Sequence, residues 1–216
     1  MIFIIFAIQY KMNAFLMKFR ILIAAALILT ICLGAYVPSK YVSRTGHIHV
    51  ESSNRFKNIV ADNYQVYCEL IPGTGQVQFT GLMKSFEFQW GALDQAFNSK
   101  RLDLSQFSKF TFDGSLTNAM SIPWDKPGTY PAQVQGTLML GGYTRITSAT
   151  GNVVVLPDGK IKANANFTIK IEEESVNTIN TMMKQKLPSV FALDVDKLGI
   201  SRDIKLNLTA NYRPRG

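Results

Sequence analysis

Two histidines and a carboxylate alternate along one short segment, His47-Ile48-His49-Val50-Glu51. In an extended strand every second side chain shares a face, so His47, His49 and Glu51 would lie together. Two imidazoles and one carboxylate are a common ligand set for zinc or non-haem iron. However, Ile48 and Val50 would then take the buried face, and the chain contains no third histidine. The pattern therefore predicts a solvated outer face, and no metal site is expected.

The sequence contains none of several common catalytic and nucleotide-binding motifs. There is no G-x-S-x-G elbow, no H-E-x-x-H motif, no phosphate-binding loop and no dinucleotide fingerprint. The three glutamates at 172–174 are expected to form a solvated acidic edge. Cys68 shares its parity with Val66 and Leu70, which predicts a buried and unreactive thiol. Because no acid–base pair can be placed on an inward face, we expect a protein that is not an enzyme.

The large apolar side chains are the candidate ligand-binding residues of this sequence. Either they pack as an ordinary core, or they line a cavity for an apolar chain. Both alternatives stay open, because a ligand enclosed by a fold lies where the core would be. The predicted ligand-binding residues are Phe79, Phe86, Phe88, Trp90, Phe97, Phe110, Phe112, Leu138, Phe167 and Met183.

Period-two alternation shows which elements position these side chains. Residues 161–171 carry apolar side chains at odd positions and polar ones at even positions, which indicates a half-buried antiparallel strand. Similar alternation covers 204–213 and 132–140. It also covers 63–70, where Tyr64, Val66, Cys68 and Leu70 are expected to face inward. We predict eight strands, at 41–52, 57–71, 75–90, 107–118, 129–141, 143–156, 160–173 and 202–213.

The connections between the strands are mostly short. Turn sequences at 72–75, 141–142 and 156–159 predict hairpins that follow one another along the chain. In the third strand the apolar parity changes after Phe79, and a bulge at Gly81 is predicted to return the later side chains to the same face. Those side chains are Leu82, Phe86, Phe88 and Trp90.

Two connections are long enough to hold further elements. Residues 91–106 contain a predicted short helix around 92–97. Residues 174–201 contain a second predicted helix at 176–187, which ends before Pro188. Its apolar stripe consists of Val176, Ile179, Met182, Met183 and Leu187. A short strand segment is predicted from the alternation of Phe191, Leu193 and Val195.

Consecutive antiparallel strands with one apolar face leave exposed edges unless the sheet closes on itself. We therefore predict an all-β fold, an eight-stranded antiparallel up-and-down (lipocalin-like) barrel with one or two short helices in long connections. An eight-stranded barrel is either filled by side chains or holds one small ligand. Small residues on or near the inward faces favour a hollow barrel: Gly81, Gly136, Ala132, Ala163, Ala165 and Ala210.

The N-terminal 35 residues are predicted to be a signal peptide. A basic stretch at 17–20 precedes an uncharged run at 21–35, which is too short to span a bilayer as a helix. Met17 is the predicted true start, and cleavage near Ala35 would remove Cys32. Lipidation of Cys32 is not favoured, because Ile31 before it is larger than a lipobox requires. The single domain is then 36–216, in the periplasm or secreted.

Overall charge gives nucleic-acid binding no support. The 216 residues have a formal charge of +8, of which the predicted signal peptide contributes +3. The remaining +5 is a mild excess that suits solubility. Two cysteines exclude a disulfide-stapled miniprotein.

Seven short motifs follow one another in an order that has a known parallel. They are Thr45-Gly46-x-Ile48-x-Val50, Ala61-Asp62-Asn63-Tyr64-Gln65-Val66, Thr74-Gly75-Gln76-Val77-Gln78-Phe79, Met83-Lys84-Ser85-Phe86-Glu87-Phe88, Ala96-Phe97-Asn98, Phe107-Ser108-Lys109-Phe110-Thr111-Phe112-Asp113-Gly114 and Val134-Gln135-Gly136-Thr137-Leu138. As an ordered set over 45–213, they resemble YceI-like proteins. The resemblance implies an exported bacterial lipocalin-like barrel that holds a polyisoprenoid, such as a quinone or polyprenyl lipid.

The sequence departs from the family pattern at two places. Phe107-Ser108 replaces the usual Tyr-Pro, and Gly141-Gly142 replaces the usual His-Gly, whereas Thr144-Arg145 is retained. A family histidine that fixes the polar head of a ligand would therefore be missing here. Arg145 shares parity with Thr147 and is expected to point outward, so it is given no catalytic role.

We therefore expect a carrier or sequestering protein for an isoprenoid-type or other long-chain apolar ligand. The alternative is a secreted structural or protein-interaction barrel with a filled core. No cofactor is expected apart from a bound isoprenoid lipid or quinone. The expected partner is an apolar lipid, with transient membrane contact and no nucleic acid.

Overall fold

The computed structural model describes residues 39–53, 58–98, 105–140, 143–170 and 203–215. Its elements are β1 Lys40–Ser53, β2 Asn58–Ile71, β3 Gln76–Leu82, η1 Met83–Ser85, β4 Glu87–Phe88, α2 Gly91–Asn98, η2 Ser105–Phe107, β5 Lys109–Leu116, η3 Ala119–Ser121, β6 Gly128–Leu140, β7 Tyr143–Val155, β8 Ile161–Lys170 and β9 Asp203–Arg215. Among these residues, no helix is long and apolar enough to cross a membrane.

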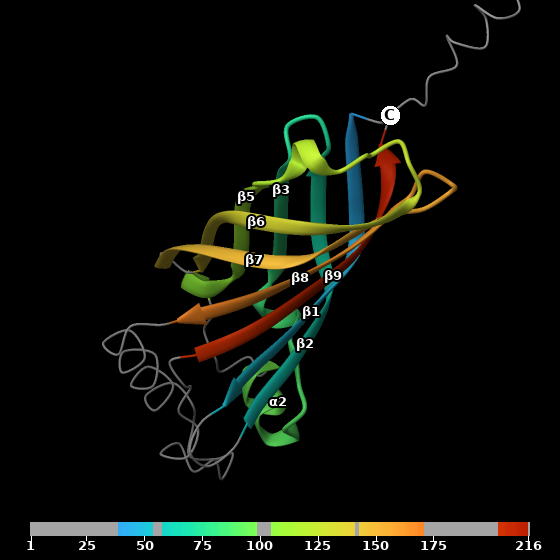
Figure 1. Ribbon diagram of the computed structural model, residues 1–216. Coiled ribbons are helices and arrows are strands. Elements are labelled where there is room, and N and C mark those ends of the chain that lie inside the picture. Colours follow the sequence, from blue (N-terminus) through green and yellow to red (C-terminus); the bar gives the residue numbers. More distant parts are fainter. Residues whose placement is uncertain (1–38, 54–57, 99–104, 141–142, 171–202, 216) are drawn as a thin grey trace, which may run out of the picture. The chain divides into compact units, whose positions relative to one another are not determined.

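Eight strands close into an antiparallel barrel (Figure 1). The order around the barrel is β1-β9-β8-β7-β6-β5-β3-β2, and β2 pairs back with β1 to complete the ring. The two-residue strand β4 adds a short pairing to β2 beyond the end of β3. Closure leaves every long strand with a neighbour on both sides, which removes the exposed edges of an open sheet. The predicted all-β, lipocalin-like barrel is confirmed.

Tight turns join β2 to β3 and β7 to β8, where the sequence predicts hairpins. Gly75 and Gly159 have positive φ angles of 73° and 76°, a conformation that glycine adopts without steric cost. The connection between β5 and β6 is longer and covers one end of the barrel. Within it Ile122 is buried, and Trp124 packs against the core while its indole N–H donates to the carbonyl of Ala119.

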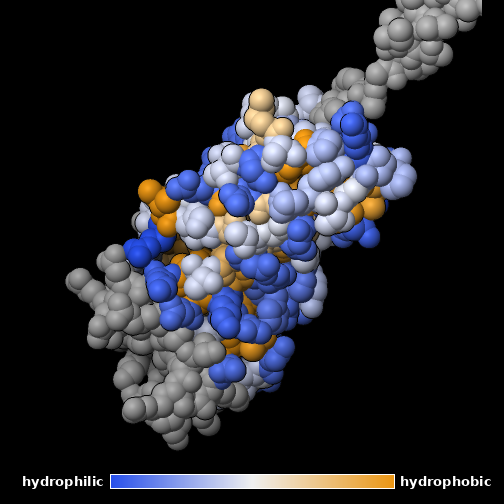
Figure 2. Space-filling model, in the orientation of Figure 1, coloured by the Kyte–Doolittle hydropathy of each residue, from blue (hydrophilic) through white to orange (hydrophobic). Residues whose placement is uncertain are grey.

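Alternation sets the inward faces of β8 and β9 as predicted. Ile161 and Phe167 of β8 are buried, and so are Leu206, Leu208, Ala210 and Tyr212 of β9. The intervening polar residues lie outside, where the side-chain amides of Asn166 and Asn207 hydrogen-bond across the two strands. In Figure 2 the outer face turned toward the viewer is largely hydrophilic, with hydrophobic side chains showing between polar ones.

The predicted parity of the second strand is wrong at its centre. Val66, Cys68 and Leu70 face inward as expected, but Tyr64 is 53% exposed and Asn63 is fully buried. The register with β1 explains this reversal, because Gly46 pairs with Val66 whereas Ile48 pairs with Asn63. Between these two pairs, Tyr64 and Gln65 of β2 oppose only His47 of β1, which is a β-bulge. Residues on the two sides of the bulge therefore have opposite parity.

The predicted bulge at Gly81 is also wrong. β3 pairs with β2 and β5 without a register shift, then ends at Leu82, which is 56% exposed. The change of parity instead occurs in the 3₁₀ turn η1, after which Phe86 is buried and β4 begins. Gly81 has another use, because a Cβ there would come within 2.8 Å of Cε1 of the Phe110 ring. The glycine makes room for that ring.

The long connections can be compared with prediction only in part. The short helix predicted around 92–97 is confirmed as α2. The helix predicted at 176–187, the strand segment around 191–195 and the glutamates at 172–174 lie outside the described residues, as does the N-terminal segment 1–38.

Candidate ligand cavity

An apolar cavity of about 50 Å³ lies inside the barrel. It occupies the half nearer the β2–β3 and β7–β8 turns, since its wall includes residues close to both turns. Its apolar lining consists of Leu70, Val77, Phe79, Phe112, Leu116, Ala132, Val134, Val153, Ala163, Ala165, Phe167, Leu208, Ala210 and Tyr212, with Gln78 and Asn164 adding polar atoms. Such a lining favours an apolar guest over a charged one.

Three phenylalanines form one boundary of this cavity. Phe79 stacks on Phe112 with ring centroids 4.9 Å apart, and Phe167 packs edge-on against both, at 5.9 and 5.4 Å. They come from β3, β5 and β8, so the cluster crosses the interior from one wall to another. We call these three residues the aromatic layer. It separates the cavity from Phe110 and Phe86, whose rings continue the packing toward the opposite end.

Small inward residues divide into two groups with different consequences. Space above the glycines is filled, because the ring of Phe112 covers Gly114 and Gly136 and that of Phe110 covers Gly81. Space beside the alanines is not filled. All four predicted alanines line the cavity, namely Ala132, Ala163, Ala165 and Ala210. The hollow predicted from small residues therefore exists beside the alanines and not beside the glycines.

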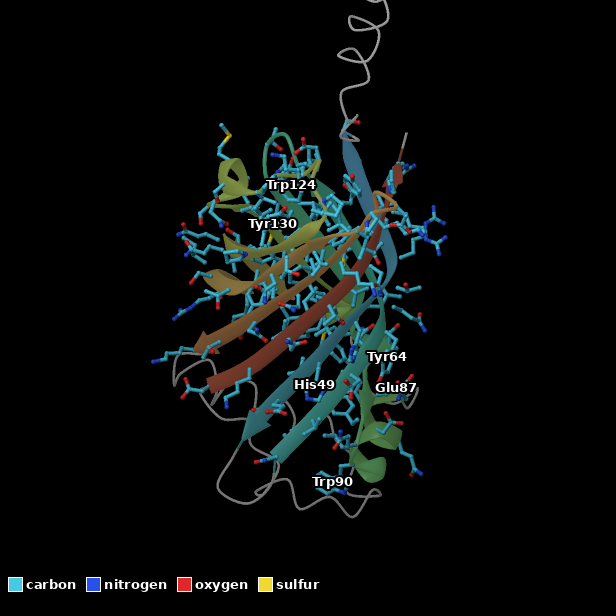
Figure 3. All side chains as sticks on the ribbon, turned by 45° about the vertical axis from the view of Figure 1, so that its right-hand side comes forward. His49, Tyr64, Glu87, Trp90, Trp124 and Tyr130 are labelled. Atoms are coloured by element: carbon cyan, nitrogen blue, oxygen red, sulfur yellow. The ribbon has the colours of Figure 1, made fainter. Side chains whose placement is uncertain are left out.

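The predicted ligand-binding residues divide between the cavity lining, the core outside it and the region around α2. Phe79, Phe112 and Phe167 line the cavity, whereas Phe86, Phe110 and Leu138 pack in the core outside its lining. Phe88 and Phe97 contact each other, with centroids 4.8 Å apart, where α2 meets β4. Trp90 lies near α2, at the end of the barrel away from Trp124 (Figure 3). Met183 lies outside the described residues.

Tyr212 is a lining residue that the sequence analysis did not select. Its hydroxyl hydrogen-bonds with the thiol of Cys68, and burial raises the pKa of Tyr212 well above its ordinary value. Burial likewise raises the pKa of the Cys68 thiol to about 12. The predicted buried, unreactive cysteine is thus consistent with its surroundings, because the thiol stays protonated at neutral pH. The alternation over 204–213 already places Tyr212 on the inward face, which was the signal that could have selected it.

Arg145 does not have the outward parity that was expected. It shares its parity along β7 with Ala149 and Val153, which are buried, and it pairs with Leu138 of β6. Its position is near the end of β7, and the side chain is exposed there. It lies beyond the aromatic layer and is not part of the cavity lining.

The histidines of β1 lie on the outer wall, as predicted. Ile48 between them is fully buried, while His47 and His49 both hydrogen-bond to Oδ1 of Asp62, at 2.7 and 2.8 Å. The hydrogen bond with Asp62 raises the pKa of His49. Burial alone would raise the pKa of Asp62, but the bonds from both histidines outweigh it and lower that pKa.

Sequence reasoning missed Asp62 as a partner of the histidines. Strict alternation with Val66 and Cys68 would place Asp62 inside the barrel. The bulge after Asn63 turns it outward, opposite its register partner His49.

No protein-family model matches the sequence, and a comparison with curated proteins found no match. Among solved structures, a polyisoprenoid-binding domain from Saccharophagus degradans implicated in plant cell wall breakdown matches with a TM-score of 0.62 and 14% identity, over 82% of this chain and 99% of that one. BcnA from Burkholderia cenocepacia matches with a TM-score of 0.49 and 12% identity, over 78% and 96% of the two chains. A YceI protein from Campylobacter jejuni gives 0.41 and 16%, over 76% and 87%.

Identities this low show a shared fold and nothing finer. The first match spans nearly all of its domain and most of this chain, so the likeness concerns the whole barrel. It agrees with the ordered motifs in the sequence, which resemble YceI-like proteins over 45–213. In its fold, the chain is similar to that polyisoprenoid-binding domain from Saccharophagus degradans.

Proposed function

We propose that this protein is an exported carrier that holds an isoprenoid-type or other long-chain apolar ligand inside its barrel. The apolar cavity beside the aromatic layer carries the proposal, because four alanines there leave space where larger side chains would complete a core. Among the described residues, those that line the cavity include neither a carboxylate nor an imidazole. The role proposed is therefore binding without catalysis, and the aromatic layer is the surface that the ligand contacts.

The ligand must enlarge the cavity that it enters. Pockets for small molecules measure about 300–1,000 Å³, whereas this cavity measures about 50 Å³. Rotation of Phe79, Phe112 or Phe167 would free the most volume, since aromatic rings are the bulkiest part of the lining. It would also join the cavity to the space around Phe110 and Leu138. The aromatic layer would then act as a displaceable wall.

A short stretch of ligand inside the barrel would be enough for binding. At about 0.8 kcal/mol per buried CH₂, one five-carbon isoprene unit contributes about 4 kcal/mol before any cost is subtracted. A micromolar complex corresponds to about 8 kcal/mol. Three or four units exceed that value, which leaves a margin for moving the rings and ordering the chain. The remainder of a long lipid could stay outside the barrel.

The ligand class rests on two supports of different kinds. The apolar lining indicates a hydrocarbon guest but not which one. The matching domain from Saccharophagus degradans is described as polyisoprenoid-binding, which favours an isoprenoid among hydrocarbon chains. A quinone or a polyprenyl lipid would satisfy both, and transfer to or from a membrane would require transient contact with its surface.

Export is proposed from the sequence, because residues 1–35 lie outside the described residues. Translation from Met17 and cleavage near Ala35 or Tyr36 would release a chain that lacks Cys32. Cell fractionation and the intact mass of the purified protein test this directly. A cytoplasmic chain, or an uncleaved integral membrane protein, would contradict the proposed export.

Solvent extraction of the purified protein, followed by mass spectrometry, tests the carrier role. The extract should contain a long-chain apolar species, and the protein should protect a fluorescent prenyl probe from water. Ala165→Phe fills the cavity and should abolish both signals. Overpacking of this kind costs about 1–3 kcal/mol of stability, so the variant should still fold. The matched control Lys162→Phe adds the same ring to an exposed position of β8 and should change neither signal.

A filled barrel that acts as a secreted structural or protein-interaction module is the second candidate. It is favoured by the small volume of the cavity and by the close ring contacts of the aromatic layer. Its working surface would be the outer polar rows of β8 and β9. Repeated empty extracts, together with no protection of the probe by the wild type, would refute the carrier and support this module.

A further inference from the structure

Three metal-ligating side chains meet on the outer wall of the barrel. His47 and His49 come from β1 and Asp62 from β2, and each offers a donor atom that lies within 4.8 Å of the other two. We call these residues the outer-wall triad. Nε2 of His47 lies 2.7 Å from Oδ1 of Asp62, and Nδ1 of His49 lies 2.8 Å from the same oxygen. The triad belongs to the part of the molecule that the proposed carrier role does not use.

Neighbouring side chains hold both imidazole rings in place. Tyr64 stacks on His47 with ring centroids 4.4 Å apart and an interplanar angle of 8°. Nε2 of His49, the nitrogen on the far side of that ring, lies 3.2 Å from a carboxylate oxygen of Glu51. Metal-ligating histidines commonly bind a carboxylate through their second nitrogen, which fixes the tautomer and the ring orientation. His49 has that arrangement before any ion is added.

We propose that the outer-wall triad binds a divalent first-row transition metal ion, Zn²⁺ or Cu²⁺. Imidazole nitrogen and carboxylate oxygen suit these ions, which are bound at about 2.0–2.2 Å. Two ligands at that length are about 3.4 Å apart around a tetrahedral ion. The present nitrogen–oxygen distances are shorter by less than 1 Å, so small side-chain rotations would admit the ion. Three protein ligands leave a further position for water or another donor.

The surrounding charge suits a cation. Glu51 belongs to the cluster, and Glu87 of β4 is the register partner of Asp62. Figure 3 shows His49, Tyr64 and Glu87 along one flank of the barrel, on the adjacent strands β1, β2 and β4. Lys205 of β9, paired with Glu51, is the basic residue nearest in register. The histidine and Asp62 side chains are 31% and 16% exposed, so an ion could enter from solvent.

The site is separate from the lipid cavity. Ile48 points inward between the two histidines and is fully buried, yet it is not part of the cavity lining. Metal binding can therefore succeed or fail whether or not the barrel carries a lipid.

Titration of the EDTA-treated protein, prepared without a histidine tag, tests the proposal. Isothermal titration should show one Zn²⁺ per chain, and Cu²⁺ should give an electron paramagnetic resonance spectrum with nitrogen hyperfine structure. Since the sequence contains only these two histidines, imidazole nitrogens bound to copper must come from the triad. Absence of a one-to-one site, or a copper spectrum without nitrogen ligands, would overturn the proposal.

Variants separate this site from adventitious binding. Asp62→Asn keeps the size of the side chain but removes its charge, and it should weaken Zn²⁺ binding at least tenfold. The double variant His47→Gln with His49→Gln should abolish binding. Glu51→Gln should weaken it about tenfold, as losses of orienting partners do. Thr209→Ala, at the register partner of His47 on β9, is the control and should bind like the wild type. Equal affinity in the wild type and the double variant would refute the site.

Discussion

Gly136 lies directly beneath the ring of Phe112, and a Cβ built on the glycine would come within 2.7 Å of Cζ of that ring. Gly114, the register partner of Gly136, meets the same ring in the same way, at 2.8 Å from Cε1. Phe112 is fully buried over this glycine pair. The two glycines therefore leave the space that the ring of Phe112 occupies in the aromatic layer.

Replacement of Gly136 by alanine should destabilise the barrel. The added methyl group would overlap the Phe112 ring and the backbone of β5. Overpacking of this kind lowers the free energy of unfolding by about 1–3 kcal/mol, which urea denaturation measures. The control is Gly73→Ala, because a Cβ at Gly73 meets no atom within 4 Å. Equal stability of the two variants would show that Phe112 and the strands adjust at no cost.

Removal of one ring from the aromatic layer should enlarge the cavity. Phe167→Ala deletes a buried ring that packs against both Phe79 and Phe112, and such deletions cost about 3–5 kcal/mol. If a lipid occupies the interior, the variant should keep or increase its lipid content while the ligand-free form loses stability. Extraction and denaturant unfolding give the two quantities. Loss of the lipid from a variant that still folds would show that this ring holds the ligand directly.

Phe107→Ala is the matched control for that experiment. Phe107 stacks on Tyr143, with ring centroids 6.4 Å apart, and belongs to neither the aromatic layer nor the cavity lining. Its removal should leave the lipid content unchanged and cost less stability than removal of Phe167, since the side chain is only half-buried.

Strand number and closure could be predicted from the sequence because several segments alternate clearly and turn sequences separate them. The inward faces of β8 and β9 follow that alternation without interruption. The bulge in β2 could not be predicted in the same way, because it depends on which residues of β1 lie opposite. The β1–β2 pairing has two register shifts, and the one between Gly46 and Ile48 places Asp62 outside beside His49. This shift therefore decides whether the outer-wall triad exists.

The packing around small inward residues could also not be predicted from the sequence. The sequence indicates where side chains are small but not which neighbour fills the vacated space. The space above Gly136 is filled by the ring of Phe112. This residue lies 24 positions earlier in the chain and belongs to the adjacent strand. Ala165 has no such neighbour and borders the cavity. The difference follows from register across the sheet, which short-range patterns do not contain.

Asn63 should be essential for the bulge that turns Asp62 outward. Its fully buried side chain accepts a hydrogen bond from the N–H of Gln65 and donates one to the carbonyl of Leu82. Asn63→Leu would leave both backbone groups without these partners, at about 1–3 kcal/mol each. Thermal and urea unfolding should show a loss of about 2–6 kcal/mol.

The control for that loss is Asn211→Leu, which makes the same change at an exposed position of β9. Its stability should stay close to that of the wild type. A nuclear magnetic resonance spectrum of Asn63→Leu in which the amides of 60–66 keep their wild-type shifts would contradict the role assigned to Asn63, because the bulge would then persist without it.

Glu69 should make the barrel more stable at neutral than at acidic pH. The hydrogen bond from Lys40, at 2.7 Å, and a second one from the Tyr67 hydroxyl lower the pKa of its carboxyl. A carboxyl whose pKa is lower in the folded state stabilises the fold above its unfolded pKa, about 4.3 for glutamate. That contribution disappears as the pH falls from there through the lower, folded value.

Glu69→Gln should therefore make the free energy of unfolding depend less on pH between neutral and acidic values. Lys40 and Glu69 are partly exposed, so the effect should be about 1 kcal/mol or less at neutral pH. Urea unfolding from pH 7 to pH 3 should show the wild type and the variant converging as the pH falls. Asp113→Asn, an exposed carboxyl on β5, serves as the control and should run parallel to the wild type. If Glu69→Gln runs parallel to the wild type as well, the ion pair with Lys40 contributes nothing measurable to the stability of the fold.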